Sequence, residues 1–143
     1  MRCSWKAGFV AEQRYFTPAE VEALIPVLTE IMDDVMAAKA ELATVRERFH
    51  GEQERIAMTG GAVIDRAAWR EGKTALTRAS ARIQRRLEEI TKLGGVTKDL
   101  GTGLVDFPHL RKGEVVNLCW KHGERSITHW HGLDEGYANR KPL

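Results

Sequence analysis

The chain has 143 residues, of which 43% are hydrophobic and 29% are charged, and its formal net charge is +2. This composition is ordinary for a soluble globular protein with one modest core, and the small net charge gives no reason to expect nucleic-acid binding. No stretch approaches the roughly 20 apolar residues of a membrane span, and the N-terminus lacks the apolar core of a signal peptide. We therefore expect a cytoplasmic protein without a membrane anchor, in which Cys3 and Cys119 form no disulfide.

The first predicted element is a long helix that begins near Pro18. Residues 1–14 show no periodicity and are predicted to form an N-terminal extension, after which residues 15–143 form a single domain. Thr17 can cap the helix, Pro18 suits its first position, and Glu20 completes a capping box. Apolar residues then recur at steps of three and four, which draws one helical stripe: Val21, Leu24, Leu28, Ile31, Val35, Ala38, Leu42, Val45 and Phe49.

A second helix is predicted between the glycine pairs Gly60-Gly61 and Gly94-Gly95. Its apolar residues repeat every seven positions: Trp69, Leu76, Ile83 and Ile90. The short glycine break favours an antiparallel hairpin over residues 15–94. The first arm is mainly acidic and the second mainly basic, so their flanks can pair beside the apolar seam. Because the acidic arm also screens the basic one, and no aromatic residues interleave with the bases, we regard nucleic acid as an unlikely partner.

Beyond Gly95 the periodicity changes from helical to extended. Residues 103–108, 114–120 and 125–131 are predicted to be strands, whereas residues 132–143 look irregular. The predicted fold class is therefore α+β. A long antiparallel helical hairpin is followed, over residues 95–143, by a β cap with a small antiparallel sheet of two or three strands and a C-terminal tail.

Spaced motifs support this organisation. They are Phe16 to Glu20, Val96 to Leu100, Gly103 to Pro108, Leu118-Cys119-Trp120 with Gly123-Glu124, Trp130-His131, and Gly136-Tyr137 with Arg140 and Pro142. Together they resemble the bacterial domain-of-unknown-function family 2203, from about Arg14 to the end of the chain. The resemblance implies a helical arm followed by a small β region, and it implies no activity, because none is established for the family. The residues at positions 1–13, His122 and His129 depart from the family pattern.

A metal site in the β cap is one hypothesis. Cys119, His129 and His131 offer a thiolate and two imidazoles, which zinc, iron or copper accept as ligands, and the two histidines share one face of a strand. An even number of residues in the hairpin loop places Cys119 on the face of Trp130, opposite both histidines. An odd number places Cys119 with them. Because two- and four-residue loops are common and the spacing matches no closed zinc pattern, the metal is not the favoured interpretation.

A small-ligand pocket is a second hypothesis for the same region, with six candidate residues: Asp106, Cys119, Trp120, Trp130, His131 and Arg140. Arg140 can clamp a carboxylate or phosphate, or it can pair with Asp106 or Asp134. Asp106 can cap a turn or orient a histidine or arginine across the sheet. Buried packing roles for the cysteine, the tryptophans and the histidine are the simpler alternative. A haem bound through Cys119 or His131 is conceivable, although no Cys-x-x-Cys-His motif is present.

From these observations we expect a non-enzymatic interaction or scaffold protein, whose helical hairpin binds a protein partner or a second copy of the chain. The alternative is a protein that binds a small ligand, a metal or haem in the C-terminal pocket. A third hypothesis, in which Cys119 is a nucleophile with a histidine base, finds no support in the spacing of the residues.

Overall fold

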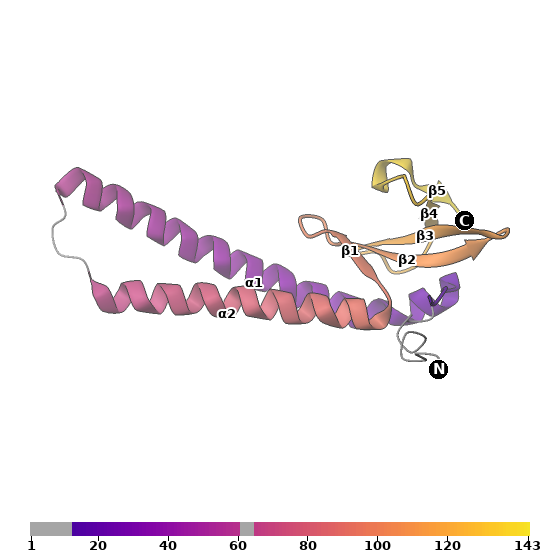
Figure 1. The fold of residues 1–143 in the computed structure, drawn as a ribbon, viewed down its shortest axis with the longest axis horizontal. Coiled ribbons are helices and arrows are strands. Elements are labelled where there is room, and N and C mark those ends of the chain that lie inside the picture. Colours follow the sequence, from indigo (N-terminus) through magenta and orange to yellow (C-terminus); the bar gives the residue numbers. More distant parts are fainter. Residues whose placement is uncertain (1–12, 61–64) are drawn as a thin grey trace, which may run out of the picture.

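The computed structural model describes residues 13–60 and 65–143, whose fold is shown in Figure 1. Two helices precede an antiparallel sheet. The elements are α1 (Pro18–Thr59), α2 (Arg66–Leu93), β1 (Val96–Asp99), β2 (Leu104–Arg111), β3 (Glu114–Lys121), β4 (His129–His131), the short 3-10 helix η2 (Tyr137–Asn139) and β5 (Lys141–Pro142). The predicted order of helices and antiparallel sheet is confirmed. Of the predicted extension, residues 1–12 lie outside the described residues. Within the described ranges, no helix is both long enough and apolar enough to cross a membrane.

The helix ends follow the signals in the sequence. Thr17 Oγ1 accepts the N–H of Glu20 at 3.2 Å, and the Glu20 carboxylate accepts the N–H of Thr17 at 3.3 Å, so the predicted capping box is confirmed. Gly60 ends α1 in the left-handed conformation, with φ of 72°. Asp65 caps the start of α2, and Gly94 ends that helix with φ of 101°. Glycine is favoured at both C-caps because a Cβ atom disfavours positive φ.

The two helices lie antiparallel, side by side, and form the elongated part of the molecule (Figure 1). Ion pairs join their flanks. Arg82 of α2 pairs with both carboxylate oxygens of Asp34 of α1, and Arg86 Nε lies 3.3 Å from Asp34 Oδ2. Arg86 also lies 3.7 Å from Glu30. The predicted pairing between an acidic and a basic arm is therefore present along this part of the seam.

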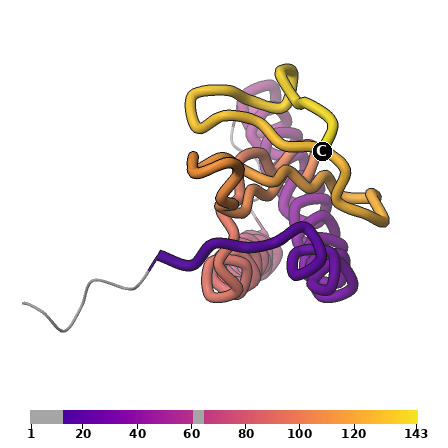
Figure 2. Tube along the Cα trace, turned by 90° about the vertical axis from the view of Figure 1, so that its right-hand side faces the viewer, coloured from indigo at the N-terminus to yellow at the C-terminus, as the bar shows by residue number. Residues whose placement is uncertain are grey.

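The sheet packs one face against the helices. Four of its fully buried side chains, Val105, Phe107, Leu118 and Trp120, join one apolar cluster with residues of both helices and with Phe16. Figure 2 shows the orange strands β2 and β3 between the helices and the yellow C-terminal part of the chain, which contains β4 and β5. The opposite face of the sheet is thus turned toward that segment rather than toward the helices.

The predicted count of two or three strands is wrong, because the sheet has five strands in the order β1-β2-β3-β4-β5. The prediction omitted β1, which pairs Val96 with Asp106, and β5, which pairs Lys141 with Trp130. Strands of four and two residues are too short to show an alternating pattern. They are extended because a neighbouring strand offers them backbone hydrogen bonds, which the local sequence does not reveal.

The predicted end of the first long strand at Pro108 is also corrected, because β2 continues to Arg111. Pro108 lacks an N–H, but its carbonyl accepts the N–H of Phe16 at 2.7 Å, on the side away from β3. No ladder bond to β3 is lost there, so the strand tolerates the proline. A tight turn then follows, with φ of 51° at Lys112 and 83° at Gly113.

The connection between β3 and β4 decides which side chains share a face. It comprises residues 122–128, an odd number. In the resulting register Asn117 pairs with His131, and Leu118 pairs with Trp130. Trp130 therefore lies on the face of Leu118, whereas Cys119 lies on the face of His131. Of the two alternatives that the sequence left open, the structure has the one that brings the thiol and the imidazole together.

Candidate metal and ligand site

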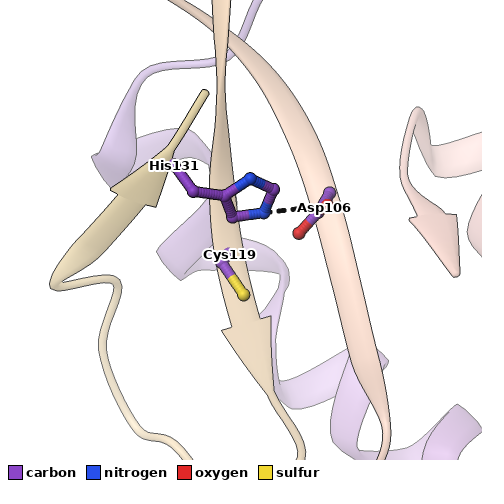
Figure 3. A group of neighbouring side chains, drawn as sticks. All are labelled: Asp106, Cys119 and His131. Atoms are coloured by element: carbon purple, nitrogen blue, oxygen red, sulfur yellow. Dashed lines mark ion pairs between the residues drawn. The ribbon is translucent and has the colours of Figure 1, made fainter. Parts of the chain in front are cut away.

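Three side chains from three adjacent strands meet on the face of the sheet turned away from the helices (Figure 3). Asp106 comes from β2, Cys119 from β3 and His131 from β4. One carboxylate oxygen, the thiol sulfur and one ring nitrogen all lie within 4.8 Å of one another. The three residues are 3%, 2% and 3% exposed, respectively. A thiol, an imidazole and a carboxyl group are thus gathered in a site closed to solvent.

Strand periodicity places these groups. Asp106 alternates with Val105 and Phe107, and Cys119 alternates with Leu118 and Trp120, all four of which are in the core against the helices. Asp106 is paired directly with Cys119 in the register of β2 and β3. The polar positions consequently face the other layer, where the C-terminal segment lies beyond the sheet (Figures 1 and 2).

His131 is held through both ring nitrogens. Nδ1 lies 2.8 Å from the carbonyl oxygen of Gly132, and Nε2 lies 3.0 Å from Asp106 Oδ2. Because a carbonyl oxygen only accepts hydrogen bonds, Nδ1 carries a hydrogen and donates it. His131 therefore presents Nε2 to the carboxyl group of Asp106.

Burial raises the pKa of the Cys119 thiol to about 12, and the neighbouring Asp106 carboxylate adds to the rise. At neutral pH the thiol is therefore protonated. A protonated, buried thiol is a poor nucleophile, so the geometry gives no support to the hypothesis of a catalytic cysteine.

The second oxygen of Asp106 has no hydrogen-bond partner. Oδ1 is buried, and no donor among residues 13–60 and 65–143 contacts it. Leaving a buried carboxylate oxygen without a donor costs on the order of 1–3 kcal/mol or more. This oxygen is available as a ligand, and the residues present fit a metal ion: His131 keeps Nε2 toward the site because its Nδ1–H is fixed by a backbone carbonyl, as in many protein metal centres.

Arg140 borders the same cluster. Its side chain is 9% exposed and donates to Glu124 Oε2 at 2.8 Å. Its Nη2 also lies 3.1 Å from His129 Nδ1, which must accept, because a guanidinium only donates. Arg140 is thus bound to Glu124 rather than to Asp106 or Asp134. Its Nε, which is buried, has no partner among the described residues.

His129, a predicted metal ligand, is not part of the three-donor group. Its Nδ1 contacts Arg140 and the Thr128 hydroxyl, the latter at 2.7 Å. In its place the structure supplies Asp106, which is a predicted ligand-pocket residue but not a predicted metal ligand. The signal for this pairing is the register of β2 and β3, which follows from the short turn at Lys112-Gly113.

The two tryptophans lie on the other face of the sheet from Cys119. Trp120 is fully buried in the core, and its indole N–H donates to the carbonyl oxygen of Glu124 at 3.0 Å. Trp130 packs against the same core, with Arg111 and Lys141 over its ring at 4.8 Å and 4.7 Å. The structure therefore gathers Asp106, Cys119, His131 and Arg140 from the predicted pocket and separates the two tryptophans from them. Glu124, which holds Arg140, belongs to the Gly123-Glu124 motif but is not among the predicted ligand-pocket residues.

Comparison with known protein families gives one match. The model of an uncharacterised conserved protein family, DUF2203, matches residues 14–143. Neither the curated proteins nor the solved structures contain a match to the chain. The family match agrees with the resemblance seen in the motifs. Because the family is uncharacterised, the chemistry of the site is inferred from its side chains.

Proposed function

We propose that this chain, which belongs to the DUF2203 family of uncharacterised conserved proteins, binds a divalent transition-metal ion, preferably zinc, through Asp106, Cys119 and His131. The observation that carries the proposal is the meeting of a carboxylate oxygen, a thiol sulfur and an imidazole nitrogen within 4.8 Å, in a buried site. These are the three ligand types that zinc takes from proteins. The reducing cytosol, which we propose as the compartment, keeps such a thiol free.

The spacing of the donor atoms suits zinc. Zinc bonds to nitrogen and oxygen are about 2.0–2.2 Å long and those to sulfur about 2.3 Å, so donors around a tetrahedral ion lie roughly 3.3–3.8 Å apart. His131 Nε2 and Asp106 Oδ2 are 3.0 Å apart and need only a small separation to admit the ion. Binding of the ion displaces the proton of the Cys119 thiol. Asp106 and Cys119 together then neutralise its two charges.

A zinc ion held by three protein ligands keeps a fourth position for a further ligand. Sites of this kind exchange a ligand or activate a bound water, whereas structural sites are closed by four protein ligands. The proposed function is therefore binding of a metal with an open position, and no reaction is assigned to it.

The test is metal analysis of protein purified without chelators. We expect about one zinc per chain, and cobalt should give an intense thiolate charge-transfer absorption that requires Cys119. His131→Gln and Cys119→Ser should each lower metal affinity by about 10- to 100-fold or more. His122→Gln is the matched control, because His122 lies on the helix-facing side and contacts Asp33 of α1 at 2.7 Å. Circular dichroism would confirm that the variants fold. Wild-type protein that binds neither zinc nor cobalt would refute the proposal without recourse to any variant.

The helical hairpin supports a second candidate function, association with a second copy of the chain. Near the end of the hairpin remote from the sheet, a groove of about 600 Å³ lies between α1 and α2. Phe49 and Trp69 line it, with their ring centroids 4.6 Å apart. The same groove carries charged residues of both signs at its margin, Arg48, Glu52, Asp65 and Glu71. An apolar groove with charges of both signs at its margin can pack against the same groove of a second copy.

A further inference from the structure

Arg140 carries a donor that the fold leaves unused. Its side chain is only 9% exposed, its Nη2 is engaged by Glu124, and its buried Nε–H has no acceptor among residues 13–60 and 65–143. A buried cationic donor without an acceptor costs more than a neutral one, so the arrangement calls for an occupant that accepts. Because this occupant must accept a hydrogen bond, it is not a second cation.

The Arg140 side chain lies near the proposed metal site, since its charge acts on Cys119. The register that pairs Asn117 with His131 and Leu118 with Trp130, continued by one residue, puts Cys119 opposite His129. Arg140 Nη2 is 3.1 Å from that histidine. Burial lowers the pKa of the Arg140 guanidinium, but its hydrogen bond to Glu124 and the nearby charges of Glu124 and Cys119 outweigh this and raise the pKa. Arg140 thus remains a cation at the border of the cluster.

Two side chains near Cys119 consequently carry unsatisfied groups of opposite kind. One is the acceptor Asp106 Oδ1, and the other is the donor Arg140 Nε. We propose that the open position of the metal takes a small oxyanion, a carboxylate or phosphate oxygen, whose second oxygen accepts the Nε–H of Arg140. This inference rests on the proposed metal function. The planar guanidinium is the side chain best suited to oxyanions of this geometry.

The charges of the site agree with an anionic ligand. Asp106 and the Cys119 thiolate already neutralise a divalent ion, so the charge of an added anion has to be met by another group. Arg140 supplies it, because its partner Glu124 is 27% exposed and is partly screened by water, whereas the guanidinium is 9% exposed. A neutral water in the open position needs no such cation, and this difference makes the two occupants distinguishable.

The experiment uses the cobalt-loaded full-length protein, titrated in separate arms with formate and with inorganic phosphate while the visible d–d absorption is followed. We expect at least one of the two anions to shift the d–d bands, and the arm that responds identifies the class of oxyanion. Arg140→Gln should keep the cobalt thiolate absorption but weaken anion affinity by about tenfold or more. Arg140→Lys should recover part of it. Lys141→Gln is the control, because Lys141 is the adjacent cation and pairs with Glu135 at 3.0 Å instead.

The outcomes separate this inference from the metal proposal. If cobalt gives the thiolate absorption but neither anion shifts the d–d bands, the position holds water alone and the oxyanion inference is wrong, while the metal site stands. An equal response in wild type and Arg140→Gln also overturns the role of Arg140. Absence of the thiolate absorption counts against the metal site itself.

Discussion

At the scale of single residues, Asp106 shows how the polar face of the sheet is organised. Its carboxyl group is 3% exposed, one oxygen contacts His131, and the other has no partner. An apolar residue at this position would pack without that cost, so the carboxyl group is better explained by a ligand than by stability. The same reasoning applies to Arg140, whose Nε is the other unsatisfied group beside Cys119.

We predict that Cys119 of the metal-free, folded protein resists iodoacetamide at pH 7 to 8. Burial raises its pKa to about 12, so little thiolate is present. The side chain is also 2% exposed, so the reagent cannot reach the sulfur. Alkylation should follow unfolding, which is checked by mass spectrometry with and without denaturant. Rapid labelling of the native protein would contradict the buried position of the thiol.

The raised pKa of Cys119 also determines the direction in which the stability of the protein changes with pH. Below the ordinary thiol pKa of about 8.5, Cys119 is protonated in both the folded and the unfolded chain, and its contribution to stability is complete. Above that value the unfolded thiol ionises first, so this contribution is lost as the pH rises toward the folded pKa of about 12. Cys119→Ala should remove this part of the pH dependence.

At the scale of elements, the start of α1 links the helices to the sheet. The capping box fixes Thr17 and Glu20, and directly before it the N–H of Phe16 donates to Pro108 of β2 at 2.7 Å. The carbonyl oxygen of Phe16 also contacts His109 Nδ1 at 2.6 Å. A local helix signal and a long-range backbone contact therefore meet at one point.

We predict that Thr17→Ala destabilises the protein by about 0.5–2 kcal/mol, because the N–H of Glu20 loses its acceptor at the helix start. The measurement is the free energy of unfolding in urea. Thr44→Ala is the matched control: Thr44 is exposed in the middle of α1, and its hydroxyl donates to the carbonyl oxygen of Ala40 in the preceding turn. Equal effects of the two substitutions would show that the cap does not anchor the helix.

Close contacts between elements also explain why residue 95 is a glycine, although its backbone conformation does not require one. A Cβ atom at Gly95 would lie 2.9 Å from both Phe107 and Val105 and 3.1 Å from Ile90. The chain passes from α2 into β1 at this point, against the core, and no side chain fits between the layers. The sequence indicates a break at Gly94-Gly95, but the need for the second glycine is apparent only from the packed layers.

At the scale of the whole molecule, the sheet supports only the part of the hairpin near it. The core cluster takes Val21 to Val35 from α1 and Ile90 from α2, with Ile83, Leu87 and Leu93 packed against it. The rest of the hairpin extends away from the sheet (Figure 1). There Gly72 allows the close approach of Phe49, whose ring atom would lie 2.5 Å from a Cβ at that position. Two helices without a third layer leave Phe49 and Trp69 partly exposed.

If a second copy fills the groove, the protein should be a dimer at micromolar concentration, as measured by analytical ultracentrifugation. Trp69→Glu should shift it to monomer, because the substitution places a charge in the apolar groove. Leu133→Glu is the control, since Leu133 is 60% exposed and lies in the C-terminal segment rather than on the hairpin. A wild-type protein that stays monomeric across the accessible concentrations would contradict the association.

The sequence by itself determined the helices, their caps and the antiparallel order of the sheet, because these depend on local signals: the Thr17 capping box, the glycines that end each helix, and the repeat of apolar residues. It also indicated Cys119, His131, Asp106 and Arg140 as candidate residues of a ligand site. The tertiary structure decided which of them meet, since a strand shifted by one residue turns every side chain to the other face. The seven-residue connection over 122–128 put Cys119 beside His131, and long-range pairing recruited β1 and β5, whose short sequences carry no pattern of their own.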